Sequence, residues 1–161
     1  MKLKRKIALL FASISFFSLG VWESINATHD LIKIYQGENV DNITSGKGTL
    51  IYPNGDKYEG DIVDNVFHGK GTLTLANGDK IAGDWTKGLA NGKGTYNWSN
   101  GDKYEGDFVK GKMTGKGTFT FAELGKYEGD LVDGVFHGKG TITLKNGKKI
   151  KGKWLNGNLV N

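Results

Sequence analysis

The side chains best suited to chemistry in this 161-residue chain are its histidines, aspartates and lysines. His68 and His137 occupy equivalent places in a recurring pattern. The chain has no cysteine, which excludes a disulfide framework, a thiolate metal site and a thiol nucleophile. Acids and bases recur at the same interval as the histidines: Asp61, Asp84, Asp107 and Asp130, and Lys70, Lys93, Lys116 and Lys139. Metal binding, acid–base catalysis and ion pairing are the chemistries that these residue types offer.

The elements that must position these residues follow a 23-residue repeat that begins at Tyr35. Glycine fills the third, twelfth and fourteenth positions, and all of the 26 glycines except Gly20 lie inside the repeats. A fixed period of this kind is typical of a repeat architecture. We divide the chain into residues 1–27, a linker or cap at 28–34, and a repeat domain at 35–161. The copies are 35–57, 58–80, 81–103, 104–126, 127–149 and a half-copy, 150–161.

Each full copy alternates with period two, which predicts two antiparallel strands per copy. In the second copy we expect Tyr58, Gly60 and Ile62 on one face, with Lys57, Glu59 and Asp61 on the other. A loop is expected over 64–68, and Asn-Gly pairs such as Asn77-Gly78 predict type I′ turns. The turn after Phe121 lacks this pair and is expected to be irregular. The predicted fold is all-β, an elongated single-layer antiparallel meander of tandem hairpins, preceded by one N-terminal hydrophobic helix.

Aromatic residues recur on the same face as the repeat glycines. A glycine leaves a slot on the face of a strand, and an aromatic ring can lie across it. The rings are therefore expected to be structural first, and the apolar strip that they form is also the candidate interaction surface. Its members are Tyr58, Trp85, Tyr96, Trp98, Tyr104, Phe108, Tyr127 and Trp154.

None of the chemical candidates forms a recognisable catalytic or cofactor site. Six strand spacings separate His68 from His137, or roughly 29 Å, so the two cannot share a metal ion. The aspartate and lysine columns lie on the polar face, where a cross-strand ladder of ion pairs explains them. The Gly-x-Gly segments lie between strands and open no helix, unlike a phosphate-binding loop. We expect no enzyme, no cofactor and no metal.

The net charge is unevenly distributed. Of the formal +5, +3 lies in residues 1–27 and only +2 in the rest, so no basic stripe for nucleic acid runs along the repeats. Lysines that have no acidic residue near them in the sequence are concentrated at the C-terminal end. They are expected either to contact an anionic surface or to discourage the addition of another strand at a sheet edge. These candidate contacts are Lys145, Lys148, Lys149, Lys151 and Lys153, next to Lys139.

The N-terminal segment has the pattern of a secretory signal. Basic residues at 2–6 precede an apolar or small-residue run at 7–22, which is near the lower length limit for a membrane-spanning helix. We expect residues 1–27 to be a cleaved signal peptide or a retained signal anchor. Either role places the repeats outside the cytoplasm, at the cell membrane or secreted.

The unit YEGDLVDGVFHGKGTI, which begins at Tyr127, resembles the MORN repeat (membrane occupation and recognition nexus). The matching residues in this copy are Tyr127, Gly129, Leu131, Gly134, His137, Gly138 and Gly140. The resemblance extends over residues 35–161 and implies a non-catalytic scaffold or interaction module. Its expected partner is a protein, a second copy of the chain, or the membrane or envelope surface. The alternative is a cell-surface module that binds cell-wall glycan on the aromatic face.

Overall fold

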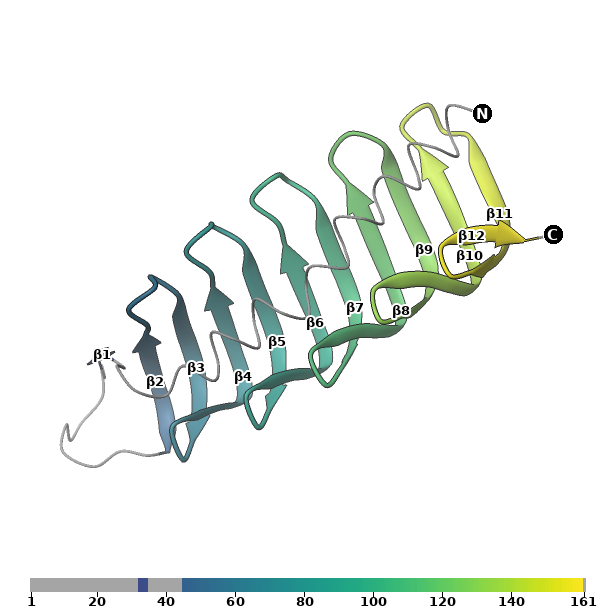
Figure 1. Ribbon diagram of the computed structural model, residues 1–161. Coiled ribbons are helices and arrows are strands. Elements are labelled where there is room, and N and C mark those ends of the chain that lie inside the picture. The colour runs from purple at the N-terminus through teal and green to yellow at the C-terminus, as the bar shows by residue number, and fades with distance from the viewer. Residues whose placement is uncertain (1–31, 35–44, 161) are drawn as a thin grey trace.

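The structure is a computed structural model that describes residues 32–34 and 45–160 of the chain. Its strands form one sheet, in which each strand pairs antiparallel with the next along the sequence (Figure 1). The strands are β1 (Ile32–Ile34), β2 (Gly46–Ile51), β3 (Lys57–Val63), β4 (Val66–Thr74), β5 (Lys80–Thr86), β6 (Leu89–Asn97), β7 (Lys103–Val109), β8 (Lys112–Phe121), β9 (Gly125–Val132), β10 (Val135–Leu144), β11 (Lys149–Leu155) and β12 (Asn158–Val160).

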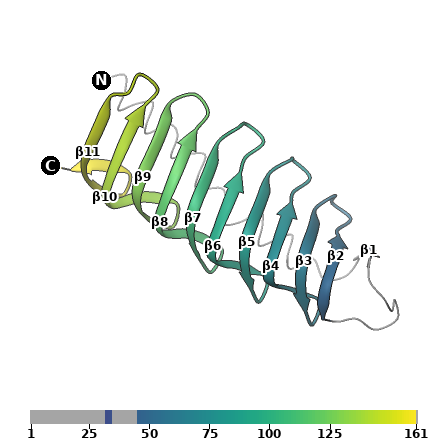
Figure 2. The same cartoon turned by 180° about the vertical axis from the view of Figure 1, so that it is seen from behind.

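The described strands make a single open layer, as the period-two pattern predicts. Figures 1 and 2 show them side by side in chain order, from β2 at one end to β11 and β12 at the other. Ten strand spacings of about 4.8 Å give a sheet roughly 48 Å long between β2 and β12. The all-β meander is therefore confirmed for these residues. The predicted N-terminal hydrophobic helix lies outside them.

The two kinds of turn are the reverse of those predicted. The Asn-Gly segments are not type I′ turns, because only the glycine has positive φ, as at Gly78 (90°). Gly78 N–H donates to Leu75 O, which closes a turn before the glycine instead of around it. The expected loop at 64–68 is in fact a two-residue turn, with φ of 51° at Asp64 and 61° at Asn65. These positive angles match the twist of the paired strands, which type I′ geometry requires.

The turn after Phe121 is irregular, as predicted. Three residues connect β8 to β9, and Phe121 pairs directly with Gly125. Lys145 N–H donates to Leu124 O, so this turn also contacts the following repeat. The loss of the Asn-Gly pair thus shortens the connection without breaking the sheet.

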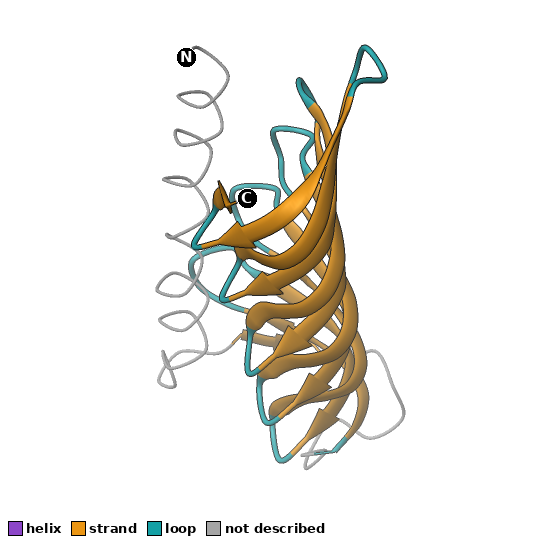
Figure 3. Cartoon of the chain, turned by 90° about the vertical axis from the view of Figure 1, so that its right-hand side faces the viewer, coloured by secondary structure: helices purple, strands orange, loops and turns teal. Residues whose placement is uncertain are grey.

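The second strand of each hairpin carries a bulge beside a repeat glycine. These strands are β4, β6, β8 and β10. Along β3 and β4 the register jumps between Gly60, which faces Gly71, and Asp61, which faces His68. Two residues of β4 are thereby left over, and the first of them, Gly69, has a φ of 53°. Bulges bend a strand and increase its twist. Figure 3 shows the sheet edge-on, with the strands bent instead of flat.

A row of ten glycines crosses the sheet from β2 to β11. Each glycine faces the next across a strand pair: Gly48, Gly60, Gly71, Gly83, Gly94, Gly106, Gly117, Gly129, Gly140 and Gly152. A Cβ on Gly117 would lie 2.7 Å from Tyr104 Oη, well inside van der Waals contact. The Tyr104 ring therefore lies across the row, as the glycine slots predict. Its hydroxyl donates to Asp107 O at 2.8 Å.

Stacked rings over this row make the core. Tyr58 packs face to face on Phe67, with centroids 3.8 Å apart, and Trp85 meets both rings edge-on. The fifth copy repeats the arrangement, with Tyr127 stacked on Phe136 at 3.6 Å. Trp85 Nε1 donates to Gly71 O at 3.0 Å, which satisfies its polar atom. The strands are bent at this level (Figure 3), and all five of these rings are buried.

Aspartates in the Asn-Gly turns connect successive repeats. Asp56 Oδ1 accepts from Ala76 N–H, and Asp102 Oδ1 accepts from Ala122 N–H, both at 2.8 Å. Asp79 is buried and accepts from Ser99 N–H at 2.8 Å and from the Tyr96 hydroxyl at 2.7 Å. Burial and the Asp79 carboxylate together raise the pKa of Tyr96. These bonds hold neighbouring hairpins at one spacing.

The ring-over-glycine contact predicts a specific coupling between two substitutions. Gly117→Ala should lower the free energy of unfolding by about 1–3 kcal/mol, because the new methyl overlaps the Tyr104 ring. In a Tyr104→Leu background the same change should cost less, since the overlapping ring atoms are gone. Urea unfolding of the four proteins measures the coupling. Gly71→Ala is the control, because a Cβ there meets the Tyr58 ring instead, so its cost should be the same with or without Tyr104→Leu. Additive costs would contradict the predicted contact.

Candidate interaction surfaces

The polar face of the sheet carries the predicted ladder of ion pairs. Lys47 Nζ lies 2.7 Å from Asp61, Lys93 Nζ lies 2.5 Å from Asp107, and Lys116 Nζ lies 2.7 Å from Asp130. Lys70 pairs with Asp84 in the same way. A second set of pairs runs within strands, where a lysine contacts the glutamate two residues later, as Lys103 does with Glu105. Over most of its length this face therefore neutralises its own charges.

The ladder aspartates also hold the bulges. Asp107 Oδ2 accepts from Lys116 N–H at 2.9 Å, and Asp61 Oδ2 accepts from Lys70 N–H at 2.8 Å. The Lys93 ammonium, followed by the Lys116 N–H, lowers the pKa of Asp107 below its ordinary value. The pKa values of Asp61, Asp84 and Asp130 are lowered by the equivalent lysine and backbone N–H partners. Each carboxylate thus links three strands.

The ladder ends in a cluster of lysines on β10, β11 and the turn between them. Three positions that carry acids in earlier copies carry lysine here: Lys148, Lys151 and Lys153. Lys153 faces Lys139 across the strand pair, and Lys149 has Lys151 two residues later instead of a glutamate. We call Lys139, Lys145, Lys148, Lys149, Lys151 and Lys153 the C-terminal lysine cluster.

All six side chains of the cluster are exposed. Lys145 reaches Glu123 at 3.9 Å, which corrects the expectation that it meets no acid. Among residues 45–160, the other five form no ion pair with a carboxylate. The like charges of Lys139 and Lys153 oppose one another directly, an arrangement that destabilises a sheet. A bound anion would remove that repulsion.

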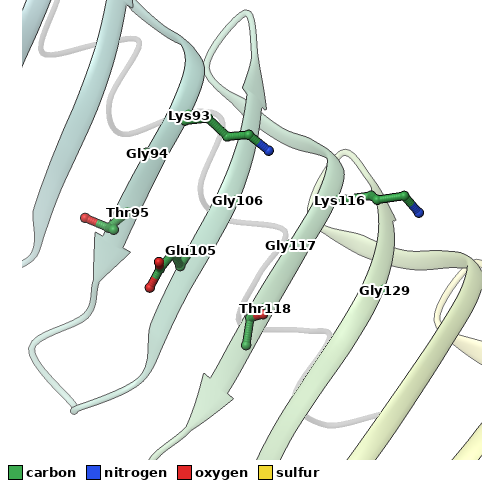
Figure 4. A pocket seen from close by; sticks show the side chains of 9 residues that line it. All are labelled: Lys93, Gly94, Thr95, Glu105, Gly106, Lys116, Gly117, Thr118 and Gly129. Carbon is green, nitrogen blue, oxygen red and sulfur yellow. The ribbon is translucent and has the colours of Figure 1, made fainter.

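A hollow of about 690 Å³ opens on the polar face in the middle repeats (Figure 4). Lys93, Lys116 and Glu105 supply its charged groups, and glycines of the central row line it between them. Each of these charged groups already has an ion-pair partner: Asp107, Asp130 and Lys103, respectively. The hollow therefore offers no unpaired charge to a ligand.

The structure places the eight candidate aromatic residues in two groups. Seven are buried in the core: Tyr58, Trp85, Tyr96, Tyr104, Phe108, Tyr127 and Trp154. Trp98 is the one that stays partly exposed, and it packs against Tyr96 and Phe119 with centroids 4.1 and 5.0 Å away. A buried ring presents no face to a ligand, so the aromatic candidates reduce to Trp98 and its partly exposed neighbours.

The histidines lie far apart, as the strand count predicts. His68 is on β4 beside Asp61, and His137 is on β10 beside Asp130, with five strands between them. Their backbone carbonyls accept hydrogen bonds from Tyr58 and Tyr127 Oη at 3.1 and 3.3 Å. These two histidines therefore contribute main-chain hydrogen-bond acceptors to the core. Within the described residues, no set of histidine and acidic side chains is placed to hold a metal ion.

The role of residues 1–27 in export or anchoring lies outside the described residues, as does most of the 28–34 segment. Within 32–34 and 45–160, no helix has the length and apolar character needed to cross a membrane. Residues 32–34 form β1, which pairs with β2.

Sequence reasoning named Lys139 as a neighbour of the candidate contacts, and it did not recognise the inter-repeat aspartates. The strand register makes Lys139 a member of the cluster, because it shows Lys153 directly opposite. For Asp56, Asp79 and Asp102 the signal is their shared position two residues after a turn asparagine. That position becomes Lys148 in the last turn, next to the lysine cluster.

Comparison with known proteins identifies one family. The family model described as the MORN repeat matches five consecutive segments, residues 35–57, 58–80, 82–103, 104–123 and 127–149. Together these segments cover more than half of the chain. A sequence search of curated proteins finds no match.

The lowered aspartate pKa values predict a loss of stability in acid. A depressed folded-state pKa stabilises the protein above the unfolded value, about 3.9 for aspartate, and that stability is lost as the pH falls below it. The urea midpoint should therefore be flat between about pH 5 and 7 and fall below about pH 4. Lys93→Gln should weaken this fall, because it removes the main partner of Asp107. Lys149→Gln, which breaks no ion pair, should leave it unchanged. Identical pH profiles for the two variants would contradict the assignment.

Proposed function

Since the chain belongs to the MORN-repeat family, we propose that it is a non-catalytic scaffold that uses its C-terminal lysine cluster to contact an anionic membrane or envelope surface. Repeats of this family are generally non-enzymatic and commonly mediate protein or membrane interaction. The proposal adds a specific surface to that general role. It also leaves the remainder of the sheet available to a protein partner or to a second copy of the chain.

The observation that carries the proposal is the replacement of acid by lysine in the last half-repeat. In earlier copies the equivalents of Lys151 and Lys153 are mostly glutamate and aspartate, which pair with lysines. The change leaves Lys139 and Lys149 without their acids and adds positive charges beside them. A departure from the repeat that costs local stability is best explained by a gain elsewhere. Attraction to an anionic surface is such a gain.

The geometry of the polar face favours a surface contact over catalysis. Carboxylates that act in acid–base chemistry need pKa values close to the working pH, which burial and neighbouring charges provide. The ladder aspartates have lowered pKa values instead and lie on an open face. They therefore remain ionised at neutral pH and serve as acceptors for lysine and backbone N–H groups.

The N-terminal segment completes the proposal. Residues 1–27 would either anchor the protein in the cell membrane or direct its secretion, which places the repeats outside the cytoplasm. The basic start and apolar run at 7–22 support this role. Fractionation of the producing cell, with the intact mass of the mature protein, tests it. Full-length protein in the membrane fraction supports an anchor, a shortened and released product supports a signal peptide, and full-length cytosolic protein contradicts both.

Because most of the candidate rings are buried, few of them could stack on a sugar in the glycan-binding alternative. Of the eight aromatic candidates, Trp98 is the one with a partly exposed ring, so stacking on a sugar would depend on it. Loss of cell-wall polysaccharide binding in Trp98→Ala, with the fold retained, would favour this alternative over the lysine cluster.

Vesicle binding by the full chain tests the lysine cluster. Replacing Lys149, Lys151 and Lys153 by Gln should weaken binding to phosphatidylserine-containing vesicles by on the order of 100-fold, at about 1 kcal/mol per lysine. Raising the salt concentration should reduce binding of the parent protein, and vesicles of neutral lipid should bind it poorly.

The matched control replaces Lys70, Lys93 and Lys116 by Gln. This variant loses the same net charge, but its lysines belong to the ladder and face aspartates. Its binding should fall much less than that of the cluster variant. Equal losses in both variants would mean that net charge alone drives binding, and unchanged binding in the cluster variant would overturn the proposed surface.

A further inference from the structure

Four Asn-Gly pairs lie in equivalent turns of the sheet: Asn54-Gly55, Asn77-Gly78, Asn100-Gly101 and Asn146-Gly147. Their backbone geometry is nearly identical. In each turn the glycine N–H donates to the carbonyl three residues earlier, at 2.8 to 3.0 Å, and the glycine φ lies between 82° and 92°. All four asparagines and their glycines are exposed. A difference in reactivity among these pairs must therefore come from the side chains around them.

An exposed Asn-Gly pair can react with its own backbone. The glycine nitrogen gives up its proton to the solvent and attacks the asparagine Cγ, so that a new C–N bond forms. The Cγ–Nδ2 bond then breaks, and the departing nitrogen takes up a proton and leaves as ammonia. Water opens the resulting succinimide to aspartate or isoaspartate, so a neutral amide becomes a carboxylate. Glycine favours the attack because it has no Cβ to obstruct it.

An aspartate restrains the asparagine in the first three of these turns. The residue two positions after the asparagine is Asp56, Asp79 or Asp102, and its carboxylate accepts from the asparagine Nδ2 at 3.0, 3.2 and 3.1 Å, respectively. The N–H of the same aspartate donates to the asparagine Oδ1. A backbone N–H of the next repeat fixes the aspartate in turn. Both ends of the amide are held, and the carboxylate opposes deprotonation of the glycine nitrogen.

The fourth turn lacks this restraint. Lys148 occupies the aspartate position, and its N–H still donates to Asn146 Oδ1 at 3.0 Å. Within residues 45–160, no carboxylate accepts from Asn146 Nδ2. Lys145 and Lys148 place ammonium groups on both sides of the pair, and nearby positive charge favours the nitrogen anion. The ion pair between Lys145 and Glu123 is long, at 3.9 Å, so it offsets this charge only in part.

Two further Asn-Gly pairs have different surroundings. Asn91-Gly92 lies within β6, where Asn91 Oδ1 accepts from Lys110 N–H of the next repeat. In Asn156-Gly157 the glycine is buried, and its N–H donates to Phe136 O of the preceding repeat at 3.0 Å. Strand pairing restrains the first pair and burial the second. The fourth Asn-Gly turn is therefore the least protected of these sites.

We propose that Asn146 is a modification site, which deamidates faster than its three equivalents and places a carboxylate inside the C-terminal lysine cluster. Asn146 follows Lys145 directly and precedes Lys148 by two residues, so the reaction lowers the net charge of the cluster by one. No enzyme is needed, and attraction to an anionic surface declines as the protein ages. The effect on surface binding rests on the proposed function, whereas the reaction itself does not.

Peptide mapping of the full chain tests the site. The protein is incubated in buffer at neutral pH and digested into peptides that each contain one turn, and mass spectrometry measures the fraction converted to aspartate and isoaspartate. Asn146 should convert several-fold faster than Asn54, Asn77 and Asn100. Equal rates in the four turns, or a faster reaction in one of the other three, would overturn the proposal.

A reciprocal exchange of side chains provides the matched comparison. Lys148→Asp gives the fourth turn the aspartate of the others and should slow the reaction of Asn146. Asp102→Lys removes the aspartate from the third turn and should speed the reaction of Asn100. Asn77 keeps its aspartate in both variants and is the internal reference. An unchanged rate at Asn146 in the Lys148→Asp protein would overturn the proposal, even if Asp102→Lys fails to fold.

Vesicle binding measures the consequence separately. Asn146→Asp should bind phosphatidylserine-containing vesicles several-fold more weakly than the parent protein. Asn100→Asp adds the same charge outside the cluster and should bind nearly as well as the parent. Parent-like binding by Asn146→Asp would overturn the predicted effect on the cluster. If the parent itself does not bind such vesicles, the proposed function fails, while the rates in the four turns still decide whether Asn146 is the modification site.

Discussion

The absence of side chains along the glycine row is the constraint on which the rest of the structure depends. A one-layer sheet has no opposing layer to enclose large rings, so the rings must be accommodated within the sheet itself. The tyrosines do this by lying flat across glycines of their own strand and of the next one. The bulges then bend the strands, which brings a second ring face to face with the first. Without the bare glycine backbone, neither the close approach nor the bend would be possible.

The 23-residue repeat that places the core rings also places lysines opposite aspartates on the polar face. Because lysine and aspartate columns lie on paired strands, each copy supplies the counter-charge for its neighbour. A surface built this way has little to attract a charged partner. Specific contact is then expected where a copy departs from the pattern, and the half-repeat departs most clearly, with Lys151 and Lys153 at acid positions. Position within the array, and not the repeat itself, gives this protein its distinguishing surface.

The sequence allowed strand period, face and ion pairing to be predicted because all three follow from alternation along an uninterrupted repeat. Tyr58 is buried and Glu59 is exposed, as period two requires. The turns were predicted wrongly because Asn-Gly serves both in type I′ turns and in turns that end on a glycine of positive φ, and Gly78 belongs to the second kind. The packing of the rings over glycine was predicted, but the nearly complete burial of Trp85 was not. It depends on the strand bend, which follows from the bulge at Gly69 and from no local propensity.

The central claim is that the C-terminal lysine cluster, and not the ladder of ion pairs, contacts the anionic surface. The most direct test is to map which residues of the full chain contact anionic lipid. Amide chemical shifts would be recorded with and without phosphatidylserine-containing lipid nanodiscs. The account predicts that the largest changes fall in β10 and β11, around Lys139, Lys151 and Lys153, with small changes along the ladder at Lys70 and Lys93. Changes spread evenly over the polar face, or confined to the aromatic face, would contradict it.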